Sequence, residues 1–348
     1  MGANLQNGFV RLNDDGSLVL EDHSPRHLQR NVIKCNWLPE ITEQFTGYTR
    51  VLLDGCFGES GTELQNLLLE IIGVTILGVS TRMKAPKGIV FFGATASNGK
   101  STILSLIRLI LPQSATCSIP PSDFEREQSL ATLVGKTANL TDEISNHKFI
   151  ASDKMKSLIT GDIVAAKVIY QPVFNFKPIA THIFATNELP NFKGGVDAGV
   201  ERRMLVIPFN KTIPEKKRIT NLEELIADKE ASLLVSAAIS IGGRAYQRGT
   251  FNIPASCKDA TQQWFKDSDP VREWYAEGEI GRHVDHKPKL LKELYRNFCD
   301  DIREFEDANY LPGKRRFIAQ IKALVETNID WRIERHGSGL IICRNTLV

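Results

Sequence analysis

The stretch from Gly88 to Leu111, GIVFFGATASNGKSTILSLIRLIL, constrains the fold more than any other part of this 348-residue chain. Residues 89–92 form a short apolar run rich in β-branched and aromatic side chains, which predicts a buried strand. From Thr102 onward, apolar residues recur at the spacing of a helix that packs on a sheet. A strand, a loop and a helix in direct succession favour an α/β fold with a parallel sheet at its core.

The loop between this strand and this helix has the composition of a phosphate-binding loop. It delivers backbone N–H groups, a helix N-terminus and a lysine to one concavity. Lys100 is expected to reach the β- and γ-phosphates of ATP, and the Ser101 hydroxyl is expected to ligate Mg²⁺. The residues predicted to hold the nucleotide are Gly93, Ala94, Ser97, Asn98, Gly99, Lys100, Ser101 and Thr102.

The loop departs from the usual spacing. Five residues separate Gly93 from Gly99 where four are usual, and Ala94 occupies the standard first-glycine position. Because alanine tolerates a positive φ less well than glycine, we expect irregular geometry near residue 94 and regular geometry from Asn98 to Thr102. The alternative is a glycine-containing turn with a solvated lysine. The strand before it and the helix after it favour nucleotide binding.

Two later strands are predicted to end in polar residues. The run from 135 to 141 ends in Asp142 and Glu143, a pair that suits metal-assisted hydrolysis. Asp142 would hold Mg²⁺ through water, and Glu143 would act as the general base on the attacking water. The alternative is an exposed acidic turn. A more apolar strand covers 179–187 and ends in Asn187, whose amide is expected to contact the γ-phosphate or to orient the water.

Basic residues accompany a predicted hairpin and a third apolar strand. The hairpin joins strands at 164–170 and 174–178, and Lys156, Lys167 and Lys177 supply positive charge around it. A solvated hairpin is the alternative. Arg202 and Arg203 directly precede an apolar strand, a position that suits contact with a phosphate held by a neighbouring subunit.

The C-terminal third predicts a separate small domain. Helices are expected at 290–298 and 317–325, and a two-stranded hairpin at 330–334 and 340–343. Helices closed by a hairpin indicate a winged-helix module. Lys314, Arg315 and Arg316 open its second helix and are candidate DNA phosphate contacts. A solvated charged face on a packing domain is the alternative.

The ordered set of motifs resembles the superfamily 3 helicases, specifically the primase-helicases of poxviruses, phages and plasmids. The resemblance covers nearly the whole chain. The irregular phosphate-binding loop and the polar strand before Asp142 are its two departures. The matching stretches are NGKST at 98–102, DE at 142–143, KSLITGD at 156–162, ATNELP at 185–190 and ERRMLVIPF at 201–209.

This resemblance implies an AAA+ ATPase domain at 76–255, a small N-terminal α+β region at 1–75 and a winged-helix domain at 256–348. It further implies a ring, commonly hexameric, with ATP between subunits. Arg203 or Arg202 would be the arginine finger that acts on the neighbouring subunit's ATP. Lys100, Ser101, Asp142, Glu143 and Asn187 would fill the Walker A, Walker B and sensor roles.

The same resemblance implies partners. The hairpin would project into the ring's channel and follow DNA phosphates through Lys167 and Lys177. Single-stranded and forked DNA are the expected substrates, and family members often carry a primase domain upstream. The predicted function is an ATP-dependent replicative DNA helicase. An ATP-switched initiator or loader that separates no strands, and a P-loop small-molecule kinase, are the alternatives.

Composition sets the remaining bounds. The formal net charge is only +2, so any contact with DNA must come from local basic patches. No apolar run approaches the length of a membrane span, and six scattered cysteines fit a reducing compartment. We therefore expect no membrane partner and a cytoplasmic location.

Overall fold

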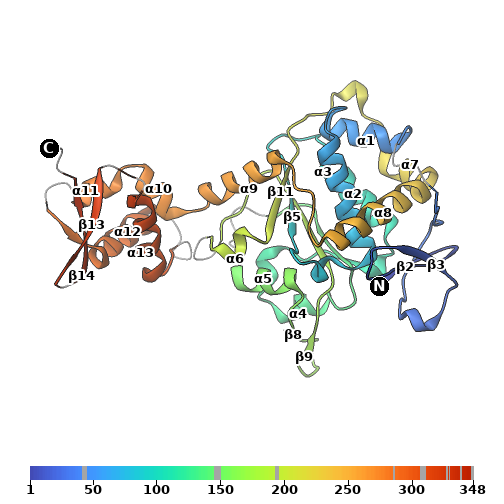
Figure 1. Ribbon diagram of the computed structural model, residues 1–348, viewed down its shortest axis with the longest axis horizontal. Helices are drawn as coiled ribbons and strands as arrows, with labels where there is room; N and C mark the ends of the chain where they lie inside the picture. The colour runs from blue at the N-terminus through green and yellow to red at the C-terminus, as the bar shows by residue number, and fades with distance from the viewer. Residues whose placement is uncertain are drawn as a thin grey trace.

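A computed structural model shows a mixed α/β protein with three apolar cores. Two cores lie on opposite faces of a central sheet, and the third belongs to a C-terminal unit that Figure 1 shows beyond the end of helix α9, Ala255–Asp267. The predicted α/β class with a parallel sheet is confirmed. The structure describes residues 1–40, 45–144, 150–192, 196–284, 287–305, 311–326, 328, 330–337 and 339–345.

The central sheet has five strands in the order β11-β5-β10-β7-β6, and every neighbouring pair is parallel. Because β10 lies between β5 and β7, the carboxyl ends of these three strands meet at one edge. That edge carries Gly93, Asn187 and Asp142, whereas Lys87 and Arg203 precede β5 and β11 at the opposite edge. The strands are β5 Gly88–Phe92, β6 Thr116–Cys117, β7 Ala138–Thr141, β10 Thr181–Thr186 and β11 Met204–Pro208.

The sheet is buried on both faces, which explains the continuous apolar run of β5. Ile89 and Phe91 join the core that includes helices α2, α3 and α8, whereas Val90 points into the core that includes α5 and α9. Alternate side chains of a strand point to opposite faces, so a strand covered on both sides has no polar face. The helices of the first core are α1 Tyr48–Phe57, α2 Thr62–Leu77, α3 Lys100–Ile110, α7 Leu222–Lys229 and α8 Ala231–Arg248.

The N-terminal region forms a four-stranded sheet in the order β3-β2-β1-β4. Leu5, Val10 and Leu12 from this sheet join the same core as Ile89, so the expected division at residue 75 does not separate two cores. Residues 9–12 and 17–20 flank the turn sequence Asn-Asp-Asp-Gly, which predicts a hairpin, and the antiparallel pairing of β2 and β3 confirms it. The strands are β1 Gly2–Leu5, β2 Gly8–Leu12, β3 Leu18–Glu21 and β4 Val32–Ile33.

The second face of the sheet carries shorter elements and a projecting hairpin. Figure 1 shows the β8–β9 hairpin extending away from the body below α4. The apolar strand expected directly after Arg203 is confirmed as β11, and the residues just before the two arginines form the short helix α6. The elements are α4 Glu127–Ala131, α5 Ser152–Thr160, β8 Val164–Ala166, β9 Phe174–Phe176, α6 Ala198–Glu201 and α9 Ala255–Asp267. Short 3₁₀ helices lie at Pro25–His27, Ser80–Arg82, Gln113–Ala115, Pro121–Asp123 and Glu215–Lys217.

Helix α9 belongs to the body that holds the five-stranded sheet rather than to the C-terminal unit. Trp264 and Phe265 lie in the second core, and the Trp264 Nε1 donates to the Pro190 carbonyl at 2.9 Å. The third core begins only at Val271. The division between the two units therefore lies near residues 268–270, beyond the expected start at 256.

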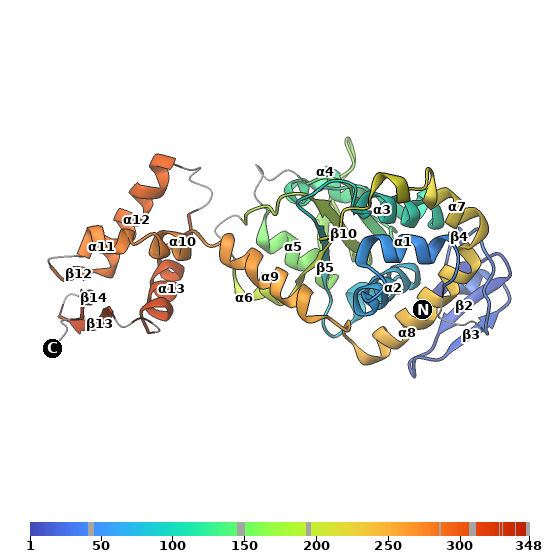
Figure 2. The ribbon, with the colours of Figure 1, turned by 90° about the horizontal axis from the view of Figure 1, so that it is seen from above.

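The C-terminal unit packs four helices against a three-stranded antiparallel sheet of order β12-β14-β13. Figure 2 shows this unit beyond α9 from a second direction. The predicted helices and the closing hairpin are confirmed. The elements are α10 Pro270–Ala276, α11 Glu279–Val284, β12 Lys289–Leu290, α12 Leu291–Phe305, α13 Lys314–Glu326, β13 Trp331–His336 and β14 Gly339–Arg344. In the described part of the chain, no helix combines the length and the apolar character needed to cross a membrane.

Candidate nucleotide site and basic surfaces

Lys100 lies buried at the carboxyl edge of the sheet, with its ammonium held by three neutral oxygens. Its Nζ donates to the Gly93 carbonyl at 2.9 Å, to Asn98 Oδ1 at 3.1 Å and to Asn187 Oδ1 at 3.0 Å. Burial lowers the pKa of Lys100. No described carboxylate forms an ion pair with it. A buried ammonium that has no counter-charge favours the binding of an anion beside it.

The loop geometry explains two of its glycines. A Cβ on Gly93 would lie 2.4 Å from Asn98 Nδ2 and 2.7 Å from the Phe209 carbonyl, so the backbone passes too close for any side chain. Gly99 has φ +89°, and a Cβ there would lie 2.2 Å from Cys56 Sγ. The irregular positive φ falls at Ser97, at +59°, rather than at Ala94.

A cavity of about 230 Å³ adjoins this loop. One wall is the loop itself with the first turn of α3, and the facing walls are apolar. They come from α1 and from the segment after β11. The loop wall consists of Ser97, Gly99 and Thr102, and the apolar residues are Val51, Leu52, Ile213, Ile219 and Leu222, with Lys217 and Arg218 at the rim. Such a site suits a flat apolar group beside bound phosphates.

Asp142 is engaged by an arginine that the sequence analysis did not single out. Arg108, near the end of α3, donates from Nη1 to Asp142 Oδ1 at 2.8 Å and pairs through Nη2 with Asp142 Oδ2 at 2.6 Å. Its Nη2 also donates to the Leu140 carbonyl at 2.9 Å. Glu143 and Ser101 are exposed. The structure therefore unites Lys100 with Asn187, whereas Asp142 is paired with Arg108.

Arg202 and Arg203 lie at the edge of the sheet opposite Lys100. Arg203 follows α6, and its backbone carbonyl accepts from the Gly88 N–H at 2.8 Å, at the first residue of β5. The loop that leads to Lys100 begins only after the last residue of β5, and five residues of strand span about 16 Å. Neither arginine can therefore reach the candidate nucleotide site of its own chain.

The two arginines differ in exposure. Arg202 is exposed, whereas Arg203 is half-buried and donates from Nη1 to the Gly199 carbonyl at 2.9 Å. Burial, and then the charge of Arg202, lower the pKa of Arg203. Its Nε is buried and has no hydrogen-bond partner among the described atoms.

The β8–β9 hairpin carries Lys177 at its base, and Lys167 opens the loop between its two strands, which is apolar at its tip. Lys167 and Lys177 are exposed, one on each side of the hairpin. Tyr170 is fully exposed with φ +64°, and Ile169 is 65% exposed. Lys156, by contrast, is engaged in ion pairs with Asp153 and Asp197, both at 2.8 Å. Burial opposes its charge, but these pairs outweigh it and raise the pKa of Lys156.

The basic residues at the start of α13 also include both exposed residues and one that faces acidic groups. Lys314 and Arg315 are exposed, whereas Arg316 is half-buried and faces acidic groups. Burial lowers the pKa of Arg316, opposed by the charges of Asp269 and Asp197. Lys314 and Arg315 are therefore the two that are free to meet a ligand at this helix.

The C-terminal unit also gathers Glu279, His283 and Asp301, residue types that can ligate a metal. Asp301 Oδ2 accepts from Trp274 Nε1 at 2.7 Å and lies 2.8 Å from His283 Nε2. Glu279 pairs with Arg282 at 2.7 Å. We interpret this group as a network that ties α10, α11 and α12 together.

Sequence reasoning missed the Arg108 pair and the apolar cavity walls for different reasons. Arg108 lies two helical turns beyond Lys100, so only knowledge of the strand order would place it beside β7. Val51 and Leu52 precede the loop by more than forty residues and carry no motif. Tertiary contacts alone bring these residues to the site.

Comparisons with known proteins support the fold. The apo structure of the NrS-1 C-terminal region matches with a TM-score of 0.52 and 13% identity, over 89% of this chain and 78% of that one. A JCV helicase structure aligns at a TM-score of 0.35 and 13% identity, over 69% and 67% of the two chains, which is too low to establish a shared fold. A family of unknown function, DUF5906, matches residues 91–203. No curated protein matches the sequence. At these identities the likeness establishes that the chain has the fold of the NrS-1 C-terminal region.

Proposed function

We propose that this protein is an ATP- and Mg²⁺-dependent DNA helicase that works as a ring of identical subunits. One observation carries the proposal, namely the buried Lys100 ammonium, which three neutral oxygens hold at the N-terminus of α3 without a counter-charge. The triphosphate of ATP has the charge and shape that this cradle requires.

The described residues fit the nucleotide and the metal. The loop amides and Lys100 would bind the phosphates, and the base would occupy the apolar cavity between α1 and the segment after β11. The Ser101 hydroxyl and the Asp142 carboxylate offer the oxygen ligands that Mg²⁺ prefers. Bound there, Mg²⁺ would neutralise charge on the β- and γ-phosphates.

The roles of the chain's own residues follow from their positions. Asn187 already contacts Lys100, so its amide lies where it can contact the γ-phosphate or the attacking water. Glu143 is the proposed general base, because it is an exposed carboxylate at the same edge of the sheet. Asp142 must share its carboxylate between Arg108 and the metal's water shell.

The position of Arg202 and Arg203 supports a ring. Both lie at the opposite edge of the sheet from their own Lys100, so an arginine finger from this pair must act on another subunit. Repeated head-to-tail contact of this kind closes into a ring when the rotation between subunits permits. Sites at each interface would then link hydrolysis to movement of neighbouring subunits.

Two surfaces are proposed to contact DNA. The first is the projecting β8–β9 hairpin with Lys167 and Lys177. The second is the C-terminal unit, whose helix, strand, two helices and hairpin follow the order of a winged-helix domain, with α13 as its recognition helix. Exposed Lys314 and Arg315 at the start of α13 suit phosphate contacts.

Displacement of a labelled strand from forked DNA with ATP and Mg²⁺ tests the proposal. We expect displacement by the native chain, none by Lys100→Ala, and normal displacement by Lys84→Ala, which removes an exposed lysine outside the loop. ATP hydrolysis and DNA binding without displacement would favour the initiator or loader. Hydrolysis that is indifferent to DNA but stimulated by a small acceptor would favour a kinase.

A further inference from the structure

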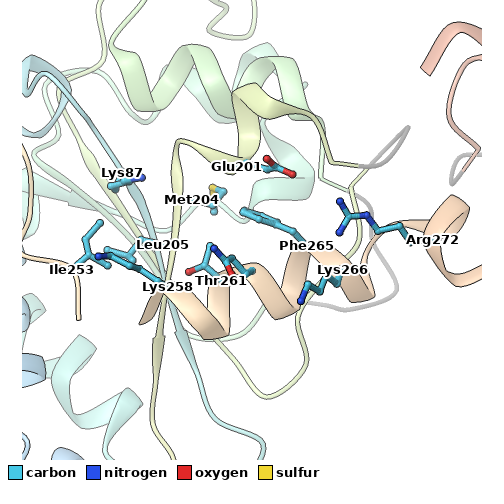
Figure 3. Close-up of a pocket in the computed structure, with 11 residues that line it drawn as sticks. Lys87, Glu201, Met204, Leu205, Ile253, Lys258, Thr261, Phe265, Lys266 and Arg272 are labelled. Carbon is cyan, nitrogen blue, oxygen red and sulfur yellow. The ribbon is translucent and has the colours of Figure 1, made fainter. Parts of the chain in front are cut away.

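A second pocket lies at the edge of the sheet opposite the phosphate-binding loop. Its volume is about 390 Å³, within the range of small-molecule sites. The starts of β5 and β11 form one side, and α9 forms the other. Figure 3 shows Lys87 at the start of β5 and Lys258 and Lys266 along α9, around the apolar side chains of Leu205 and Phe265.

The charged residues that line this pocket are mostly positive. Four of its lining residues are cations, Lys87, Lys258, Lys266 and Arg272, and one is an acid, Glu201. The net formal charge of the lining is therefore +3, larger than the +2 of the whole chain. A concave surface with this excess of positive charge concentrates anions.

Most of these charges lack a carboxylate partner within the described chain. Lys87 is half-buried, and its Nζ donates to the Arg202 carbonyl at 2.7 Å, which is a neutral acceptor. No ion pair joins Lys258 or Lys266 to a described residue, and both side chains are exposed. Arg272 pairs with Asp269 at the longer distance of 3.4 Å.

Two of the lysines that line the pocket lie on one face of α9. Lys258, Gln262 and Lys266 recur every fourth residue and so share one face of the helix. Between them, Thr261 and Phe265 turn toward the sheet, where the Thr261 hydroxyl accepts from the Val206 N–H at 2.9 Å. This bond fixes the helix against β11, so the cationic face is held over the pocket.

We propose that this pocket binds a nucleoside phosphate, with the phosphate held by Lys258, Lys266 and Arg272 and the base resting on the apolar floor. Ammonium and guanidinium donors on the rim and a floor of Leu205, Met204 and Phe265 match the two halves of such a ligand. Five residues of β5 separate it from the first site, so the two can be filled together. The ligand is either a free nucleotide or one unit of a single strand, and both share this chemistry.

Binding measurements on the full chain test the proposal. Equilibrium dialysis with ATP is expected to find two sites per chain. Lys258→Glu/Lys266→Glu is expected to lose one of them, by at least about tenfold in affinity. Lys100→Ala is expected to weaken the other site only, so failure here is distinct from failure of the proposed ATPase. Lys258→Gln/Lys266→Gln, which removes charge without reversing it, should give an intermediate loss.

A second arm identifies the source of the ligand, with a twelve-residue thymidine oligonucleotide as the probe. Two results together would identify the pocket as a site for single-stranded DNA. The native chain would bind ATP at one site only, and Lys258→Glu/Lys266→Glu would lose oligonucleotide binding. The control is Lys34→Glu/Lys292→Glu, which makes the same charge change at two exposed lysines elsewhere. Equal losses in the control, or no change in either probe with the pocket variant, would overturn the proposal.

Discussion

At the scale of single residues, the pair between Arg108 and Asp142 links the proposed metal ligand to α3. Arg108 binds both carboxylate oxygens of Asp142, yet the side chains are 31% and 50% exposed, so the pair contributes under about 1 kcal/mol. We predict that Arg108→Ala frees Asp142 for the metal. The Mg²⁺ concentration for half-maximal ATP hydrolysis should then fall by up to about fivefold.

Arg108→Lys is the matched comparison for this prediction. Lysine keeps the positive charge but loses the two-pronged geometry, so its effect should be smaller. A magnesium titration of ATPase activity measures both variants. If Arg108→Ala instead needs more Mg²⁺, then Arg108 holds Asp142 in the position that receives the metal, and the interpretation is reversed.

A second residue-scale feature is His182, which lies fully buried in β10 between two strands of the sheet. Its Nδ1 lies 3.1 Å from Asn139 Nδ2, and burial lowers its pKa to about 4 from 6.5. The unfolded chain therefore binds a proton at this residue between pH 6.5 and 4, and the folded chain does not. The folded state loses up to about 3 kcal/mol of stability as the pH falls through that window.

Urea unfolding at pH 7 and pH 5 checks this prediction. Native protein should lose about 2 kcal/mol more between these pH values than His182→Gln, which cannot take up the proton. His23→Gln, at an exposed histidine, should behave like the native chain. Equal pH dependence in the native chain and His182→Gln would show that another group controls acid stability.

At the scale of elements, the β8–β9 hairpin carries one lysine at its base, Lys177, and one where its connecting loop begins, Lys167. We predict that Lys167→Ala/Lys177→Ala weakens binding to single-stranded DNA. It should also reduce the slope of log affinity against log salt by roughly 1.4, as expected for two lost phosphate contacts. Fluorescence anisotropy over a range of salt concentrations measures the slope.

The matched variant for this prediction is Tyr170→Ala at the hairpin tip. Tyrosine carries no charge, so the salt slope should remain that of the native chain even if affinity falls. A native slope in the lysine variant would place the phosphate contacts elsewhere, with Lys314 and Arg315 on α13 the next candidates.

Hydrophobic periodicity and turn residues were sufficient to predict several elements from the sequence. The strand before the phosphate-binding loop, α3, the β2–β3 hairpin and the closing β13–β14 hairpin all follow from such patterns. Strand order does not, because it depends on which edges meet in three dimensions. That order is what brings Asn187 to Lys100 and Arg108 to Asp142. The short helix α6 was not predicted, because four residues give too little periodicity to indicate a helix.

At the scale of the whole molecule, the central sheet holds two groups of candidate site residues at its opposite edges. Its carboxyl edge carries Lys100 and Asn187, and its amino edge carries Arg202 and Arg203. Under the proposed function, a complete catalytic site would require two subunits in head-to-tail contact, and a single chain would hold two halves of different sites. This arrangement predicts complementation between variants that are each inactive.

We predict that mixing Arg203→Ala subunits with Lys100→Ala subunits restores ATP hydrolysis that neither variant has alone. Where an intact Lys100 faces an intact Arg203 across an interface, that site is complete. Random assembly of equal amounts should make about a quarter of the interfaces complete, so up to about a quarter of native activity should return if the sites act independently. Steady-state ATPase of the mixture, with ring assembly followed by light scattering, is the measurement.

The control replaces Arg203→Ala with the double variant Lys100→Ala/Arg203→Ala, because no interface in that mixture can be complete. Repeating the experiment with Arg202→Ala decides which arginine acts. Arg202 is exposed and can reach across an interface directly, whereas Arg203 would first have to break its hydrogen bond to the Gly199 carbonyl. Recovery with only one of the two variants identifies the finger. If rings form in both mixtures and no activity returns, neither arginine acts as the finger. The Lys100→Ala subunits keep both arginines, so a finger that acts between subunits would be available to every neighbour with an intact Lys100.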